Sequence, residues 1–300
     1  MFHVQKITSF GAPELQPYAT LRRPLEHREQ GIFVAESERV VRRLLASHFT
    51  VVSLVMPEKH LEHFRPAIEA RPEKENITVY LAQKQLLESL TGYSVFQGIF
   101  AVGKIPRLPT LDEILQGPPQ PSGQTGPRPP KLFVAVHEMS NAENLGALVR
   151  NCVAFGVDGL IVGETSSSPF LRRAVRNSMG TIFELPVFEI DTVRNADPSL
   201  LRNDPRRQLS LPQVLRDLRG RGVHCVAAHP HTDKKSLSQA DFSRDCCVVF
   251  GNEGDGISPA VLEACDEAVA IPMPPNVDSL NVGAAAAVFL YEAARQRGRA

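Results

Sequence analysis

The sequence predicts an α/β protein in which a parallel-sheet domain follows a smaller α/β sandwich. Apolar stretches of strand length alternate with amphipathic stretches of helical spacing along nearly the whole chain. One stretch, residues 117–130, is dominated by Pro and Gly, a composition that continues neither a helix nor a central strand. We therefore expect two domains, residues 1–106 and 131–300, joined by a linker over residues 107–130.

The first domain is expected to alternate short strands and helices. Residues 32–35 favour a strand, and the apolar residues after it recur at helical spacing, with Ser37 as a plausible N-cap. The helical positions are Val40, Val41, Leu44 and Leu45. The remaining elements are expected as strands at 51–56, 77–82 and 98–105 and as helices at 61–70 and 84–90.

The second domain repeats this alternation in longer units. Strands are predicted at 132–139, 159–164, 185–190, 224–230 and 246–250, and helices at 144–156, 168–180, 211–222 and 258–267. Nearly all-apolar strands between amphipathic helices indicate a parallel sheet covered on both faces. Such sheets bind ligands in the loops at the carboxyl ends of their strands. Residues 191–208 are polar and Arg-rich and are expected to form a surface insertion.

Composition limits the class of protein and its partners. The chain has 300 residues, 43% of them hydrophobic, without an apolar run of membrane-spanning length or a signal-peptide pattern at its start, so a cytoplasmic protein is expected. Lys plus Arg equals Asp plus Glu at 33 each, so any anionic partner has to be met by local patches. Five cysteines without a Cys-x-x-Cys pair indicate buried thiols in a reducing compartment.

Several common functional sites are disfavoured. His224, His229 and His231 could in principle gather around a metal, but no second cluster has ligand spacing, so a strand followed by a polar turn is preferred and no metal is expected. The phosphate-binding Gly-x-x-x-x-Gly-Lys-Ser/Thr loop and the Gly-x-Gly-x-x-Gly fingerprint of dinucleotide enzymes are both missing. A hydrolase elbow of the form Gly-x-Ser-x-Gly is missing as well.

Three loops rich in Gly and Asn stand at predicted strand ends instead. They are NLGALVRN, beginning at Asn144 and containing Arg150; FGNEGDGIS, containing Gly251; and IPMPPNVDSLNVG, containing Ser279 and Asn281. Taken singly, each has a structural explanation, because Asn and Ser cap helices, Gly forms turns and Arg forms surface ion pairs.

Taken together and in this order, the three loops resemble the sequence motifs of the SpoU family of RNA 2′-O-ribose methyltransferases. The matching stretches are NLGALVRN, VVFGNEGDGIS and IPMPPNVDSLNVGAAAAVFLYE, all within residues 131–300. The first half is similar to the ribosomal-protein-like, substrate-binding domain of some family members, most clearly in GIFVAESERVVRRLL. Ser37 stands where that family usually has glycine.

The resemblance implies a knotted (trefoil) methyltransferase domain, a homodimer and S-adenosylmethionine as cofactor. Carried over by position, it assigns cofactor contacts to residues of the second and third loops: Gly251, Ile271, Leu280, Asn252, Glu253 and Met273. Peptide groups of a glycine- and proline-rich loop can read an adenine edge, and Ile271 and Leu280 would supply apolar walls.

The resemblance also nominates Arg150 as the catalytic residue, supported by Asn144, Ser279 and Asn281. Because a guanidinium keeps its proton in proteins, we expect Arg150 to hold the phosphate beside the target ribose and to favour the developing alkoxide. Arg172, Arg173 and Arg176 form a possible phosphate track for RNA, although a solvated helix face explains them nearly as well.

Ribosomal RNA is the expected substrate, since the extra N-terminal domain favours it over transfer RNA. A tRNA 2′-O-methyltransferase is the alternative enzyme. A non-catalytic RNA-binding or ribosome-assembly protein with the same fold is the alternative of another class.

Overall fold

The computed structural model describes residues 1–91, 98–117, 128–190, 209–230 and 235–299. Contacts divide the chain into two compact units, Met1–Arg107 with Pro169–Glu184, and Leu108–Ser168 with Leu185–Ala300. The first break lies at the start of the predicted linker. The assignment of Pro169–Glu184 to the first unit has no counterpart in the sequence analysis.

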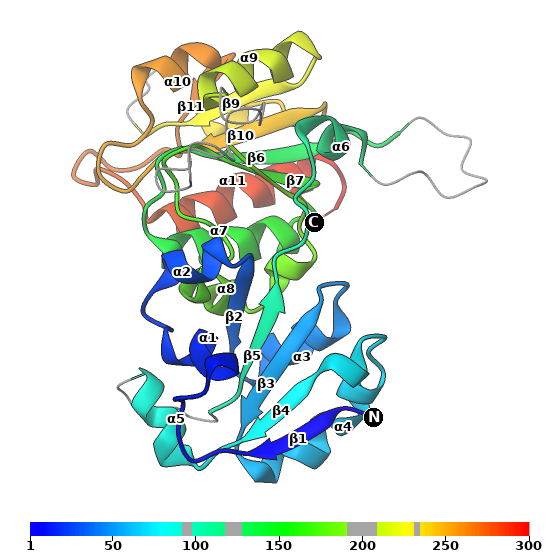
Figure 1. The fold of residues 1–300 in the computed structure, drawn as a ribbon. Coiled ribbons are helices and arrows are strands. Elements are labelled where there is room, and N and C mark those ends of the chain that lie inside the picture. The colour runs from blue at the N-terminus through cyan, green and yellow to red at the C-terminus, as the bar shows by residue number, and fades with distance from the viewer. Residues whose placement is uncertain (92–97, 118–127, 191–208, 231–234, 300) are drawn as a thin grey trace. The chain divides into compact units, whose positions relative to one another are not determined.

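The first unit is built on a five-stranded mixed sheet with the order β1-β4-β3-β5-β2 (Figure 1). The strands are β1 (His3–Lys6), β2 (Ile32–Glu36), β3 (Val51–Met56), β4 (Thr78–Leu81) and β5 (Phe100–Lys104). β1, β4 and β3 run parallel, whereas β5 is antiparallel to both β3 and β2. The edge strand β1 was not predicted, because all four of its residues are exposed and give no apolar pattern.

The first unit also contains α-helices, several of which bury an apolar stripe. They are α1 (Gln16–Ala19), α2 (Pro24–Glu29), α3 (Glu38–Ala46), α4 (Leu61–Glu69), α5 (Lys84–Thr91) and α8 (Arg172–Asn177). The predicted stripe of α3 is confirmed, since Val40, Val41, Leu44 and Leu45 are all buried. α1 and α2 were missed, because they are short and lack a full apolar period.

Residues 169–184 are an integral part of the first unit. The rings of Phe170 and Phe183 pack on those of Phe33 and Phe49, with centroid distances from 5.2 to 6.1 Å. The neighbouring polar contacts are the ion pairs of Arg172 and Arg176 with the Glu36 carboxylate and the hydrogen bond from Arg43 to the carbonyl of Met179.

Ser37 occupies the N-cap position of α3, as predicted, but it does not cap the helix with its side chain. Its backbone has φ 93° and ψ 153°, a region that L-residues other than glycine rarely adopt and that costs on the order of 1–3 kcal/mol. A hydroxyl on such a backbone accepts no hydrogen bond from the first turn. The prediction of a Ser37 cap was therefore right in position and wrong in mechanism.

The second unit contains a six-stranded sheet with the order β11-β9-β10-β6-β7-β8, and all neighbouring strands are parallel. The strands are β6 (Leu132–Val136), β7 (Gly159–Val162), β8 (Val187–Glu189), β9 (His224–Ala228), β10 (Cys246–Phe250) and β11 (Glu267–Val269). The parallel sheet predicted for residues 131–300 is confirmed. β11 was missed, because Glu267 was assigned to the preceding helix, which ends at Ala264.

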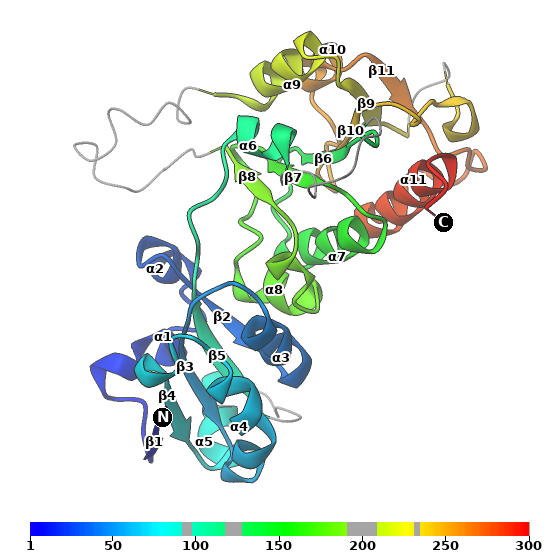
Figure 2. The same ribbon diagram turned by 90° about the vertical axis from the view of Figure 1, so that its right-hand side faces the viewer.

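Helices cover both faces of the second sheet (Figure 2). α9 (Leu211–Gly220) and α10 (Pro259–Ala264) pack on one face, and α7 (Ala142–Ala154) lies beside α11 (Val282–Gln296) on the other. The sheet's core residues Phe133, Ala135 and Val249 are completely buried. A further helix, α6 (Leu111–Gln116), begins with a capping box of Thr110 and Glu113 and lies inside the expected linker.

The strand order has one reversal point, between β6 and β10. The chain moves outward from β6 through β7 to β8 and then crosses back, so that β10 pairs with β6 on its other side. The loops that leave β6 and β10 at their carboxyl ends therefore diverge at this point. Such a place is where open parallel sheets hold ligands.

All five cysteine thiols are free and buried, as expected from the sequence. Burial raises the pKa of Cys246 to about 11 and that of Cys265 to about 12, so both thiols are protonated near neutral pH. Within the described residues, none of the helices has the length and apolarity needed to cross a bilayer.

Replacing Ser37 by Gly is expected to raise the free energy of unfolding of the first unit. Glycine relieves the backbone strain, whereas its extra freedom in the unfolded chain costs up to about 1 kcal/mol, so a net gain of about 1 kcal/mol remains. Thermal unfolding measures this change. Ser258→Gly is the matched control, because Ser258 also precedes a helix without a side-chain cap but has φ −65°; its exchange should lower stability. Equal losses in both variants would contradict the strain at Ser37.

Candidate active site

The helix that follows β6 is started by Asn141, not by Asn144. The Asn141 side-chain oxygen accepts hydrogen bonds from the backbone N–H groups of Glu143, at 2.8 Å, and of Asn144, at 3.3 Å. α7 accordingly begins at Ala142, which places Asn144 inside its first turn. The structural explanation of Asn144 as an N-cap is therefore wrong, and its side chain is available for another contact.

The loop after β10 is tightly wound around Asn252. The Asn252 side-chain oxygen accepts hydrogen bonds from the backbone N–H groups of Gly254, Asp255 and Gly256 at 2.8, 2.6 and 3.2 Å. The backbone N–H of Asn252 in turn donates to the Gly256 carbonyl at 3.1 Å. At Gly251 a Cβ atom would lie only 2.2 Å from the carbonyl carbon of Gly256, so this loop closes only because residue 251 is glycine.

The third loop connects β11 to α11 and ends in a cap. The Asn281 side-chain oxygen accepts a hydrogen bond from the backbone N–H of Gly283 at 2.9 Å, and α11 begins at the intervening Val282. Gly283 lets α11 approach α7, since a Cβ atom there would lie 3.3 Å from the Cβ of Ala147. On the same turn, the Asn151 side chain donates to the Gly283 carbonyl at 2.7 Å.

A chain of hydrogen bonds joins the three loops. Asn281 donates through its amide nitrogen to the side-chain oxygen of Asn144 at 3.1 Å, and Asn144 donates to the Glu253 carboxylate at 2.6 Å. An ionised carboxylate only accepts hydrogen bonds, so Glu253 fixes which end of the Asn144 amide faces it. Asn144 then presents its oxygen to Asn281, whose own oxygen is left for the α11 cap. The Glu253 carboxylate thus sets the donor-to-acceptor direction of every hydrogen bond that joins these residues.

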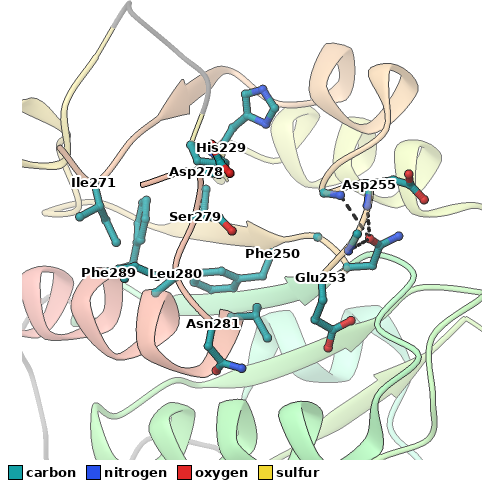
Figure 3. A pocket seen from close by; sticks show the side chains of 18 of the residues that line it. His229, Phe250, Glu253, Asp255, Ile271, Asp278, Ser279, Leu280, Asn281 and Phe289 are labelled. Carbon is teal, nitrogen blue, oxygen red and sulfur yellow. Dashed lines mark hydrogen bonds between the residues drawn. The ribbon is translucent and has the colours of Figure 1, made fainter. Parts of the chain in front are cut away.

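Beside the hydrogen-bonded residues Glu253, Asn144 and Asn281 lies a pocket of about 360 Å³ (Figure 3). Its apolar part includes Phe250 and Phe289, whose rings meet edge to face at 5.8 Å. The other lining residues come from the end of β9, the Asn252 loop, β11, the third loop and the start of α11: Ala228, His229, Pro230, Gly251, Asn252, Glu253, Gly254, Asp255, Gly256, Val269, Ile271, Met273, Asp278, Ser279, Leu280, Asn281, Val282 and Ala285. None of these lining residues is Lys or Arg.

The structure brings most of the predicted site residues together. Eight of them line this one pocket, namely Gly251, Asn252, Glu253, Ile271, Met273, Ser279, Leu280 and Asn281. Asn144 joins them through its hydrogen bonds to Glu253 and Asn281. Their meeting follows from the parallel sheet, because β6, β10 and β11 all end at the same edge of the sheet.

Four predicted residues lie elsewhere. Arg150 is exposed on α7 and is not among the pocket residues. Arg172, Arg173 and Arg176 belong to α8 in the first unit, where Arg172 and Arg176 pair with Glu36 and Arg173 is exposed.

Other pocket residues were not predicted. Asp255 and Asp278 lie next to assigned residues and could have been found by that proximity. Phe250 and Phe289 gave no signal beyond apolar periodicity, because a pocket wall and a core position look alike in sequence.

Of the three histidines considered as metal ligands, the structure describes His224 and His229. His224 contacts Asp266 and Glu267, His229 lines the pocket, and His231 lies outside the described residues. Among the residues that the structure describes, no group of three His, Cys, Asp or Glu side chains has metal-binding geometry.

Replacing Gly251 by Ala is expected to lower the free energy of unfolding by roughly 1–3 kcal/mol and to open the Asn252 loop, because the added Cβ meets backbone atoms that cannot move independently. Hydrogen exchange of the amides of residues 254–256 would report the opening. Gly254→Ala is the matched control, since its Cβ would contact only the Asn252 side chain at 3.7 Å. Unchanged protection in both variants would show that the loop does not depend on Gly251.

Comparison with known proteins places this site in a family. The model of the SpoU rRNA methylase family matches residues 131–202 and 200–291. A protein of Mycobacterium tuberculosis named as an uncharacterized tRNA/rRNA methyltransferase is 27% identical over 97% of this chain and 92% of its own length. A similarly named protein of Synechocystis is 26% identical over 98% and 95%.

Solved structures share the fold along the whole chain. An AdoMet-bound rRNA methyltransferase from Sinorhizobium meliloti superposes with a TM-score of 0.73 at 22% identity, covering 97% of this chain and 98% of its own. The SpoU methyltransferase AviRb from Streptomyces viridochromogenes, in complex with AdoMet, gives 0.72 at 24% identity, with 95% and 98% covered. With the family model matching residues 131–202 and 200–291, more than half of the chain, the chain belongs to the SpoU rRNA methylase family.

Proposed function

We propose that this protein transfers a methyl group from S-adenosylmethionine to a ribose 2′-hydroxyl of RNA, most readily ribosomal RNA. The observation that carries the proposal is the pocket at the carboxyl ends of β9, β10 and β11, joined by Glu253, Asn144 and Asn281 to the start of α7. Family membership supports the reaction type. The RNA substrate would place the protein in the cytoplasm.

The pocket residues fit the proposed cofactor. Ile271, Leu280 and the Phe250–Phe289 pair offer apolar walls for an adenosine, and the Asn252 loop brings peptide groups close to the cavity. A positively charged sulfonium meets carboxylates and no Lys or Arg in the pocket wall. The cofactor supplies an activated methyl group, so the protein mainly has to hold the acceptor in line.

Arg150 is proposed to act on the acceptor from a second subunit. No Lys or Arg lines the pocket, yet an RNA phosphate beside the reacting ribose requires a cation. Arg150 is exposed on α7, and the adjacent helix α11 exposes Ala284, Val288 and Tyr291 at successive turns. A homodimer that covers this apolar stripe would carry each Arg150 toward the partner's pocket.

The polar groups at the pocket mouth are assigned to the ribose. Ser279 and Asn281 line the pocket, and Asn144 holds Asn281 in place. A protonated Arg150 would then stabilise the developing alkoxide, and water would accept the proton of the hydroxyl. The proposal includes the knot that the family resemblance implies. Residues 251–256 and 271–281 follow different strands and contribute lining residues to the same pocket.

The first unit is proposed to hold the RNA. Arg173 and Arg176 are both exposed on α8, and Arg176 also pairs with Glu36. Arg172 and Arg176 are held by Glu36 and would contribute to a phosphate contact only while sharing that carboxylate. A transfer-RNA substrate and a non-catalytic RNA-binding role are the alternatives.

Mapping of 2′-O-methyl groups in total RNA tests the substrate. Cells without the gene are expected to lose one modification in ribosomal RNA and to regain it with the wild-type gene but not with the Arg150→Ala gene. Loss of a transfer-RNA modification instead would identify the tRNA enzyme. An unchanged map, with RNA still bound by the purified protein, would identify the non-catalytic alternative.

Arg150→Ala is expected to lower the rate of methyl transfer about 10²- to 10³-fold, because a charge at the transition state is lost. Arg150→Lys keeps the charge without the planar fork and should remain strongly impaired. Arg216→Ala, an exposed arginine on α9, is the matched control and should leave activity near wild type.

Mixing two inactive variants tests the shared site. Arg150→Ala leaves the pocket intact, and Gly251→Val leaves Arg150 intact, so mixed dimers contain one complete site. Random reassociation should restore roughly a quarter of wild-type activity. No recovery after verified subunit exchange would assign Arg150 to the pocket of its own chain.

A further inference from the structure

The wall of the pocket carries only one sign of fixed charge. Its ionisable side chains, apart from His229, are the carboxylates of Glu253, Asp255 and Asp278. The Glu253 carboxylate is engaged by Asn144. Asp255 and Asp278 are exposed, and no ion pair engages either of them among the residues that the structure describes. In a chain whose formal charges sum to zero, this pocket is a local exception.

The two free carboxylates come from different loops. Asp278 directly precedes Ser279 in the third loop and lines the pocket. Asp255 belongs to the Asn252 loop, and Figure 3 shows it apart from Asp278. Two negative groups from two walls add their fields inside the space between them.

The proposed reaction changes the charge of the molecule in this space. The methyl carbon leaves the sulfonium sulfur and bonds to the ribose oxygen, the C–S electron pair stays on sulfur, and the hydroxyl proton passes to water. The cofactor thereby loses one positive charge and becomes a neutral thioether, while its adenosine and amino-acid parts stay the same. Shape-based contacts cannot separate the two forms well, but a fixed charge can.

We propose that Asp278, assisted by Asp255, makes the pocket distinguish the methyl donor from its demethylated product by charge. This inference rests on the proposed methyl-transfer function. A carboxylate about 6 Å from a cation in a water-like surrounding changes binding about threefold, so the two together give about tenfold. The preference is greatest at low ionic strength and weakens as salt screens the pocket. Product is thereby released in favour of fresh donor.

Calorimetric titration of the dimeric full-length protein tests the proposal without relying on activity. The ligands are S-adenosylmethionine, S-adenosylhomocysteine and sinefungin, an analogue with an amine at the position of the methyl group. Asp278→Asn should weaken the donor and sinefungin about threefold and leave the product unchanged. Asp255→Asn with Asp278→Asn should reach about tenfold, and 1 M salt should remove most of the difference.

Glu263→Gln is the matched control, because it removes an exposed carboxylate of the same unit that does not line the pocket. It should change none of the three affinities. Equal weakening of donor and product by Asp278→Asn, or no change in either, would overturn the proposal, as would sinefungin behaving like the product. If wild-type protein bound none of the three ligands, the proposed function itself would fail, which is a distinguishable result.

Discussion

The hydrogen-bond chain from Glu253 through Asn144 to Asn281 is the constraint on which the site depends. These residues lie far apart in sequence, on the loop after β10, the first turn of α7 and the start of α11. Because a carboxylate can only accept, it orients both amides, and the second amide then caps the last helix. Pocket geometry and helix registration are thus fixed by the same contacts. A networked polar site of this kind is rigid only while every member is satisfied.

Much of the second unit could be predicted from sequence, because buried parallel strands and amphipathic helices leave strong patterns. The convergence of Gly251, Ile271 and Asn281 was implied by the family resemblance, and all three residues line the pocket. The role of Asn144 could not be predicted from the sequence. Its type suits a helix cap, and only coordinates reveal that Asn141 already provides the cap and leaves Asn144 to bridge two loops. The sequence did not predict β1, whose residues are exposed, or β11, which has only three residues, because neither strand shows a repeating pattern of apolar residues.

Negatively and positively charged side chains have separate positions around this site. The pocket wall is acidic and suits a cation, whereas the acceptor is a polyanion that needs positive groups. Keeping arginine out of the wall avoids neutralising the carboxylates there. In the proposed homodimer, Arg150, exposed on α7 next to an apolar stripe, would deliver the cation from a separate surface.

The membership of residues 169–184 in the first unit makes that unit discontinuous in sequence. Phe33 and Phe49 find partners in Phe170 and Phe183, which are encoded after β7 of the methyltransferase sheet. During synthesis, the first unit can therefore complete its aromatic cluster only after part of the second unit has left the ribosome. Recombination that exchanges the leading segment between relatives would separate these rings, so the two units are expected to be inherited as one module.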